Sequence, residues 1–380
     1  MFNIPAKRKN TNCYKWDNCP HTIPFGVADS DYKVPLAVRL ALHKRIAQGA
    51  FGYCIKSPTY DATLKNWIKN NYDYDVMPEQ ISVSPGTVFA MNAILSVFTK
   101  PGDKVVIQEP VYTAFPLLLK NNQNVKVFSD LIFDGKRFSI DFDDLDCKLD
   151  GAKAFIFCSP HNPVGRTWNE SEVKKVVLLC KKHNVLLISD EIHCDLMLFG
   201  SKFTSVGKYF DLYKNLVVCN APSKTFNLAG FFTSNIIFND TELKKSYDEK
   251  INSMFCAEPG LMGPIAAETV YTKCGGWMRR QNKHIEKNYL YLKKYLAQHL
   301  PKAVVTEMES TYLAFIDMRY LGKTDEELEA ELIKYGVSVN GGKMYGRNYD
   351  GWVRFNLACP IFQLKKGLKR FVDCCVFLEE

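Results

Sequence analysis

The sequence has no long run of apolar residues. No stretch approaches the roughly eighteen consecutive apolar residues that a membrane-spanning helix needs. The first thirty residues also lack the apolar core of a secretory signal peptide. These absences argue against a protein that crosses or binds a membrane, and they lead us to expect a location in the cytoplasm.

Signatures of metal binding and of disulfides are missing as well. The 13 cysteines are odd in number, lie in a chain of 380 residues and form no Cys-x-x-Cys pair, which favours reduced thiols over a disulfide framework. Cys158, Cys219 and Cys359 lie in apolar, strand-like runs, where a thiol acts as a small hydrophobic group. The seven histidines contain no His-x-x-x-His or His-Glu-x-x-His pair, so we expect no metal site.

Clustered charge is a further absence. The 49 basic and 41 acidic residues give a net charge of +8, but the basic residues are scattered and form no arm or stripe. This pattern slightly favours anionic small molecules as ligands and does not favour nucleic acid. The composition is that of a soluble globular protein, and the length predicts one large domain or two.

The middle of the chain alternates between strand-like and helix-like segments. Short, continuously apolar runs occupy residues 104–110, 152–160, 185–193 and 215–226. Residues 169–184 have a helical period with an acidic start. Because continuously apolar strands need cover on both faces, this pattern predicts an α/β fold with a parallel or mixed sheet between helices.

The C-terminal third has a different, α+β pattern. Long helical stretches occupy residues 263–300, followed by a strand-like run at 310–318 and a helix-like run at 324–336. A second strand-like run lies at 352–360, and a closing helix extends to about residue 378. We therefore expect two domains. The expected large domain covers residues 45–265, and the expected small domain combines residues 1–44 with residues 266–380.

Polar residues follow the apolar strands, at the sheet edge where α/β proteins bind ligands. They are Gly86 and Thr87 at a helix start, Tyr112, Asn162, Asp190 followed by His193, and Lys224. Each has an ordinary explanation by itself: a helix cap, a core aromatic, a turn residue or a solvated lysine. Asp190 is the least ordinary, because a carboxylate at the end of an apolar strand is costly without a cationic partner. The combination indicates a ligand site.

These residues resemble those of the fold-type I pyridoxal-phosphate enzymes, in the class I/II aminotransferase superfamily. The motifs that carry the resemblance occur in the family's order and spacing across nearly the whole chain. They are SPGT (84–87), EPVYTAF (109–115), SPHNPVG (159–165), SDEIHCD (189–195), SKTFNLAG (223–230) and VRFNLACP (353–360). The resemblance implies a large domain with a mostly parallel central sheet flanked by helices, a smaller α+β domain, and pyridoxal 5'-phosphate as the cofactor.

Within that superfamily the chain is most similar to the cystathionine β-lyase, or carbon–sulfur lyase, branch. The residues that indicate this branch are KWD (15–17), VADSD (27–31), FGY (51–53) and His193, where ordinary aminotransferases more often have tyrosine. The implied reaction is β-elimination from L-cystathionine, L-cysteine or a related S-conjugate, which yields a thiol, pyruvate and ammonia. An aminotransferase remains the alternative. A regulatory protein that keeps the fold without turnover is a third possibility.

The resemblance also implies roles for the residues around the cofactor ring. Lys224 would bind the cofactor's aldehyde and later move the Cα proton of the substrate. Asp190 would pair with the pyridinium nitrogen, and Asn162 would donate to the phenolic oxygen. Tyr112 would stack on the ring or lie at its edge, and His193 would also contact the cofactor.

The remaining implied contacts concern the phosphate, the partner subunit and the substrate. The phosphate would lie against Gly86 and Thr87 with the hydroxyl of Ser223, and Tyr53 would reach it from a neighbouring subunit, so the resemblance implies a homodimer. The substrate's α-carboxylate would be held by the fork of Arg354. Ala28 and Asp29 would complete the substrate site.

Overall fold

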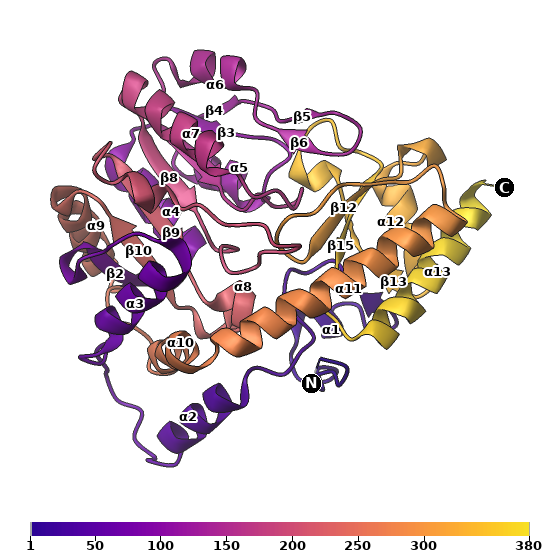
Figure 1. The fold of residues 1–380 in the computed structure, drawn as a ribbon, viewed down its shortest axis with the longest axis horizontal. Helices are drawn as coiled ribbons and strands as arrows, with labels where there is room; N and C mark the ends of the chain where they lie inside the picture. Colours follow the sequence, from indigo (N-terminus) through magenta and orange to yellow (C-terminus); the bar gives the residue numbers. More distant parts are fainter. Residues whose placement is uncertain (1, 380) are drawn as a thin grey trace.

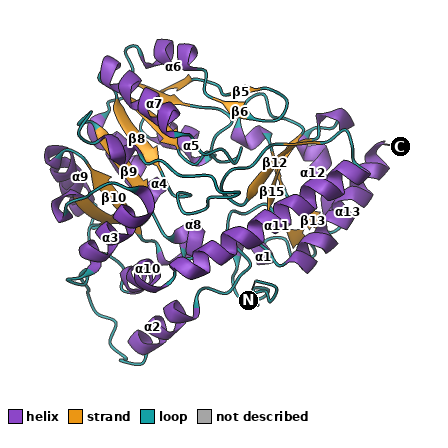
Figure 2. Ribbon diagram, viewed as in Figure 1, coloured by secondary structure: helices purple, strands orange, loops and turns teal. Residues whose placement is uncertain are grey.

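Seven strands form the central sheet of this computed structural model, which describes residues 2–379 (Figures 1 and 2). In spatial order they are β2 (Ile81–Ser84), β10 (Ser234–Phe238), β9 (Leu216–Asn220), β8 (Leu186–Asp190), β7 (Ala154–Cys158), β3 (Lys104–Ile107) and β4 (Val125–Phe128). The five strands from β9 to β4 are parallel, and β10 runs antiparallel to both of its neighbours. The predicted α/β class and mixed sheet are confirmed.

Helices cover both faces of this sheet, which explains why its strands are continuously apolar. On one face, side chains such as Ile107, Ile156 and Ile188 pack in a core with helices α4 (Thr87–Phe98), α5 (Ala114–Asn121) and α9 (Thr241–Ser253). The intervening side chains, such as Phe155, Phe157 and Leu187, point into a second core that extends into the C-terminal part. The helices on that face include α3 (Tyr60–Tyr72), α6 (Phe142–Leu149) and α7 (Glu170–His183).

The helix predicted at 169–184 shows why the local sequence was informative. The Asn169 side chain accepts from the Glu172 N–H at 3.0 Å, and the Glu172 carboxylate accepts from the Asn169 N–H at 2.8 Å, so the two residues form a capping box. The helix ends at His183, and the following cap residue, Asn184, has a left-handed φ of 54°. Helix α7 therefore begins and ends where the sequence signals lie.

The C-terminal part contains its own antiparallel sheet, in the order β11 (Val304–Val305), β12 (Leu313–Asp317), β15 (Trp352–Asn356) and β14 (Asn340–Gly341). Its helices are α10 (Met262–Lys273), α11 (Gly275–His299), α12 (Asp325–Lys334) and α13 (Ile361–Glu379). The helical stretches expected over 263–300 are two helices, α10 and α11, separated at Cys274.

The N-terminal segment joins this C-terminal part through main-chain hydrogen bonds. Strand β1 (Ile23–Pro24) pairs in parallel with β13 (Val337–Ser338), and the Asn356 N–H of β15 donates to the Phe25 carbonyl at 2.8 Å. This pairing is consistent with the expected small domain, whose exact boundaries stay a prediction. The other elements are helices α1 (Tyr14–Asp17), α2 (Leu36–Ile46) and α8 (Ser223–Phe226), the hairpin β5 (Ile132–Phe133) and β6 (Phe138–Ser139), and five short 3-10 turns.

No helix within residues 2–379 combines the length and apolar character that a membrane crossing requires. The cytoplasmic location stays a prediction. All thirteen cysteines are free thiols, with Cys158, Cys219 and Cys359 buried as expected. Among the described residues, no three His, Cys, Asp or Glu side chains gather as a group that could hold a metal ion.

Candidate active site

The carboxyl ends of the central strands surround a cavity of about 270 Å³. Nine of the residues singled out from the sequence line it, although they come from separate parts of the chain. They are Ala28, Gly86, Thr87, Tyr112, Asn162, Asp190, His193, Ser223 and Lys224. The expectation that the polar strand exits meet in one place is therefore met by the geometry.

Lys224 lies on the short helix α8, which follows β9 and lies beside α11 (Figure 1). Gln281 Nε2 of α11 donates to the Thr225 carbonyl of α8 at 2.8 Å. Its Nζ donates to the Ala28 carbonyl at 2.9 Å. Burial and the charge of Arg354 lower the pKa of Lys224 to about 8, against the opposing charges of Asp29 and Asp190. A lysine with this pKa supplies a substantial fraction of neutral amine near neutral pH, as a nucleophile or base requires.

Asp190 ends strand β8 and is buried between the thiol-bearing positions Cys158 and Cys219 of the neighbouring strands. Its Oδ1 accepts from the Ile192 N–H at 3.3 Å. The charge of Lys224 acts on Asp190 against burial without forming an ion pair with it within residues 2–379. Burial raises the pKa of Asp190 to about 7. A cationic N–H group that enters the cavity would suit this carboxyl group, because its attraction would offset the free-energy cost of burying the charge of Asp190.

His193 and Tyr112 complete the walls beside these two groups. The Nδ1 of His193 is buried and finds no hydrogen-bond partner in the described chain. Burial, with the charges of Lys224 and Arg354, holds the pKa of His193 well below its usual value, so the ring is neutral. Burial and the charge of Asp190 raise the pKa of Tyr112, which is neutral as well. Both rings can therefore contact a flat ligand without adding charge.

The start of helix α4 provides a place for an anion. The first N–H groups of a helix lack intrahelical acceptors, and no side chain within residues 2–379 caps this one. A Cβ at the preceding Gly86 would meet no atom within 4 Å, so open space adjoins the helix start. With Ser223 on the same cavity wall, this corner fits a phosphate group.

Arg354 projects from β15 of the C-terminal sheet toward the same site. Its Nη1 donates to Asn162 Oδ1 at 3.1 Å, and its Nη2 donates to the Gly26 carbonyl at 2.7 Å. The guanidinium stacks on Tyr345 at 4.8 Å, and its buried Nε is unpartnered in the described chain. The acceptors on Asn162 and Gly26 are neutral and no carboxylate within residues 2–379 pairs with Arg354, so the guanidinium is available to an incoming carboxylate.

Three sequence-predicted residues are not among those that line the cavity: Arg354, which contacts the lining residue Asn162, and Asp29 and Tyr53. Asp29 follows the cavity residue Ala28, but Arg8 holds its carboxylate with two hydrogen bonds of 2.9 and 2.6 Å. Tyr53 is fully exposed on the segment between α2 and α3 and lines no part of this cavity in the single chain. Sequence reasoning missed Tyr312, whose hydroxyl donates to the Ala28 carbonyl at 3.0 Å, because a lone tyrosine before a strand carries no distinguishing signal.

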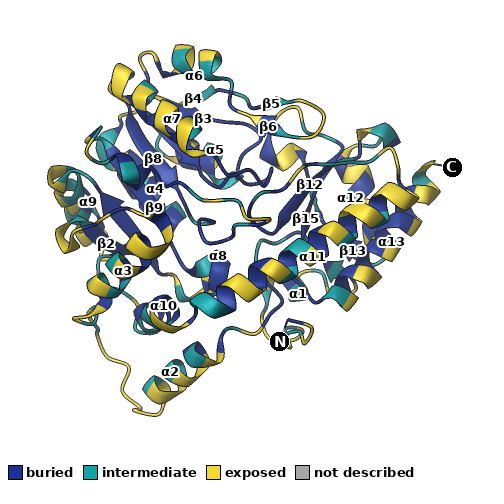
Figure 3. Cartoon of the chain, in the orientation of Figure 1, coloured by how far each residue is buried: buried dark blue, intermediate teal, exposed yellow. Residues whose placement is uncertain are grey.

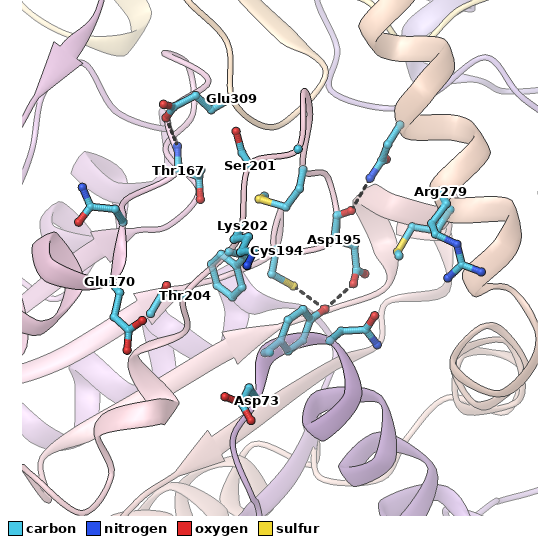
Figure 4. A pocket seen from close by; sticks show the side chains of 18 of the residues that line it. Asp73, Thr167, Glu170, Cys194, Asp195, Ser201, Lys202, Thr204, Arg279 and Glu309 are labelled. Atoms are coloured by element: carbon cyan, nitrogen blue, oxygen red, sulfur yellow. Dashed lines mark hydrogen bonds between the residues drawn. The ribbon is translucent and has the colours of Figure 1, made fainter.

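A second and larger cavity, of about 990 Å³, lies between α11, the end of α3 and the residues after His193 (Figure 4). Among its lining residues, Cys194 Sγ donates to the Tyr72 hydroxyl at 3.1 Å, and this hydroxyl donates to Asp195. Asn282 of α11 donates to the Asp195 carbonyl at 2.8 Å. None of the residues that the sequence marked as functional lines this cavity, so the smaller one is the candidate active site.

Comparison with known proteins agrees with this geometry. The family model for class I and II aminotransferases matches residues 20–371. The chain belongs to this family. The fold and the pyridoxal 5'-phosphate cofactor that the resemblance implied are therefore confirmed, and the cavity offers the cofactor a lysine, a buried acid and an anion corner.

Individual relatives narrow the comparison to one branch of the family. The chain is 35% identical over 379 residues to the cystathionine beta-lyase PatB of Bacillus subtilis (strain 168), and the match covers 97% of this chain and 98% of that protein. Cystalysin from Treponema denticola, whose structure contains pyridoxal 5'-phosphate, has a TM-score of 0.96 with 31% identity and coverage of 100% and 99%. The PLP-bound C-S lyase from Staphylococcus hominis has a TM-score of 0.94, 29% identity and coverage of 99% and 98%.

Proposed function

We propose that this protein is a pyridoxal-phosphate-dependent carbon–sulfur β-lyase that acts on L-cystathionine, L-cysteine or a related S-substituted cysteine. One observation carries the proposal. A neutralisable buried lysine and an unpaired buried carboxyl group line one cavity, and Arg354, which has no acidic partner within residues 2–379, donates a hydrogen bond to Asn162 of the cavity wall. The similarity to PatB over the full length selects the lyase branch.

The chain's own residues would hold the cofactor at three points. Lys224 would carry its aldehyde carbon, Asp190 would face its pyridinium nitrogen, and Gly86, Thr87 and Ser223 would surround its phosphate. Asn162 and His193 would contact the ring's polar edge. When bound, the cofactor supplies a conjugated ring that accepts the electron pair of the broken Cα–H bond.

Substrate positioning falls to Arg354, whose fork can take the α-carboxylate in two parallel hydrogen bonds. Lys224, once neutral, removes the Cα proton as a general base. The electron pair of that bond then allows the β-carbon–sulfur bond to break, and the protonated Lys224 can return a proton to the departing sulfur. Water converts the remaining three-carbon fragment to pyruvate and ammonia. One substrate molecule and one water molecule thus give one thiol, one pyruvate and one ammonia.

The proposal is tested by incubating the purified protein with L-cystathionine and no keto acid. We expect free thiol, pyruvate and ammonia to appear in equal amounts at a constant rate. Release of none of the three from cystathionine, cysteine or S-methylcysteine would contradict a lyase of this class. S-Methylcysteine lacks the second amino-acid group of cystathionine, so its relative rate reports how much that group contributes.

Replacement of Arg354 by lysine is expected to keep the charge but lose the bidentate fork. We expect kcat/KM for the amino acid to fall about 100-fold, mostly through KM, because two charge-assisted hydrogen bonds become one. Steady-state kinetics measures this split. Arg319→Lys, at an arginine that pairs with Asp317 away from the cavity, serves as the control and should leave KM unchanged.

We further propose that the active form is a homodimer to which Tyr53 contributes across the interface. Large apolar side chains are exposed on two adjoining segments: Phe51 (59%), Tyr53 (100%), Ile55 (88%) and Phe255 (96%). The two segments touch, because Cys54 Sγ donates to the Pro259 carbonyl at 2.9 Å. Figure 3 shows that α2 and the loop toward α3 extend from the body with mostly exposed residues. Apolar exposure of this extent is typical of an interface.

This interface leads to a paired prediction. Ile55→Asp is expected to raise the dimer dissociation constant at least about tenfold, because a charge would be buried in the interface. Tyr53→Phe is expected to keep the dimer but to weaken cofactor binding about tenfold, through one lost hydrogen bond to phosphate. Analytical ultracentrifugation and cofactor titration measure the two effects. Ile132→Asp, at an exposed hairpin position, is the matched control, and a wild-type monomer would contradict the proposal.

A further inference from the structure

The N-terminal segment carries an ion-pair network that the proposed reaction does not use. Besides its two bonds to Asp29, Arg8 Nη1 donates to Asp31 at 3.2 Å. Lys15 Nζ donates to Asp31 at 3.0 Å and lies 3.7 Å from the Asp29 carboxylate. Trp16 and Gln363 also donate to Asp31, at 2.8 and 2.7 Å. Two cations thus match two carboxylates, as buried charges require.

The network consists of a buried inner ion pair and a partly exposed outer ion pair. The side chains of Lys15 and Asp31 are each 1% exposed. Burial raises the pKa of Asp31, but the charge of Lys15 and the hydrogen bonds from Trp16, Gln363 and Lys15 together outweigh burial and lower this pKa. This inner pair anchors the segment. The outer pair of Arg8 and Asp29 is 16% and 19% exposed, so it lies nearer to solvent and adjoins the cavity residue Ala28.

The network holds residues 26–31, whose carbonyl groups receive donors from the active site. The Ala28 carbonyl accepts from Lys224 Nζ at 2.9 Å and from the Tyr312 hydroxyl. The Gly26 carbonyl accepts from Arg354. The carboxylate of Asp29 therefore belongs to the residue directly after the one that contacts Lys224.

Several charged and titratable groups face Lys224, each from a different element. Arg354 on β15 lowers the pKa of Lys224, whereas Asp29 on the N-terminal segment and Asp190 on β8 raise it. His193 is held neutral by burial and its cationic neighbours. Burial likewise raises the pKa of Tyr312, which is therefore neutral. Of the two acids near Lys224, Asp29 alone pairs with cations of the described chain, Arg8 and Lys15.

We propose that Arg8 is a positioning residue for Lys224: its guanidinium fixes and neutralises the carboxylate of Asp29, and this pair sets how strongly the active site favours the protonated lysine. The inference rests on the assignment of Lys224 as the cofactor-bearing residue. Without Arg8, the negative charge of Asp29 acts on Lys224 with only Lys15 to offset it. Without Asp29, the positive charge of Arg8 acts in the opposite direction.

The test is a pH titration of the holoenzyme without substrate, followed by the absorbance of the bound cofactor, which reports the proton on the nitrogen that Lys224 contributes. We expect Arg8→Gln to move the titration midpoint upward and Asp29→Asn to move it downward, each by about half a pH unit or more. The double variant should return close to the wild-type midpoint. Arg8→Lys, which keeps the charge, should stay near the wild type.

Two controls separate this role from a structural one. Arg319→Gln removes another bidentate arginine–aspartate pair, with bonds of 2.9 and 2.6 Å, and should not move the midpoint. Thermal unfolding of every variant measures loss of stability. Midpoints for Arg8→Gln and Asp29→Asn that stay unchanged, or that move in the same direction, would overturn the inference, even where the melting temperature falls.

A separate experiment tests whether Lys224 is the lysine that binds the cofactor. Borohydride reduction of the wild-type holoenzyme, followed by peptide mass analysis, should locate the cofactor on Lys224. A cofactor found on another lysine would show that the proposed site is wrong, before the Arg8 and Asp29 variants are compared.

Discussion

Replacement of Lys224 by alanine is expected to lower the rate of thiol release by about three orders of magnitude or more. With the roles proposed for Lys224, the variant would lose both the nucleophile that binds the cofactor's aldehyde and the general base that removes the Cα proton. No other lysine of the described chain lines the cavity, so no neighbouring lysine can take over. Pyruvate and thiol assays under saturating cofactor and substrate measure the effect.

The control for this variant is Lys202→Ala, at a lysine that lines the larger cavity. It should keep nearly full activity. Retention by Lys224→Ala of more than a few percent of the wild-type rate would mean that the proton moves through another group. The role of Lys224 as the general base would then be wrong.

Asp190→Asn is expected to lower kcat by about two to three orders of magnitude. Loss of one partner from a buried charge pair costs about 3–5 kcal/mol, and each 1.36 kcal/mol in a barrier corresponds to a tenfold change in rate. The asparagine cannot keep a proton on the ring nitrogen, so the ring accepts electrons less readily. Steady-state kinetics and the absorbance of the bound cofactor measure the loss.

The raised pKa of Asp190 leads us to expect that cofactor binding depends on pH. In the chain alone, burial raises the pKa of Asp190 to about 7. A cationic partner stabilises the carboxylate, so cofactor binding should lower this pKa and release a proton near neutral pH. Asp195→Asn, at a buried acid that faces the other cavity, should leave both the rate and the proton release within a few-fold of the wild type.

Much of the fold could be predicted because local signals and burial agree in the central sheet. The apolar run before Asp190 predicted a buried strand, and β8 ends at that residue. The helical period and acidic start of residues 169–184 predicted α7, whose first turn is capped by Asn169 and Glu172. The helical stretches expected over 263–300 correspond to α10 and α11, and the structure places the boundary between them at Cys274.

The candidate site was predictable to the extent that its residues follow strands. Asp190, Asn162 and Lys224 stand at strand exits, so topology alone brings them together. The ion pairs of Arg8 and Lys15 were not predictable, because they span 21 and 16 residues of irregular chain without any period. The role proposed for Tyr53 would require a second subunit, and it could come only from the resemblance.

The most direct test of the proposed β-elimination counts product molecules per protein chain in the absence of any keto acid. With L-cystathionine, we expect many molecules of pyruvate and thiol per chain, while the cofactor absorbance returns to its starting spectrum. At most one product molecule per chain, with the cofactor converted to its amine form and restored only by added keto acid, would show an aminotransferase and contradict the lyase function.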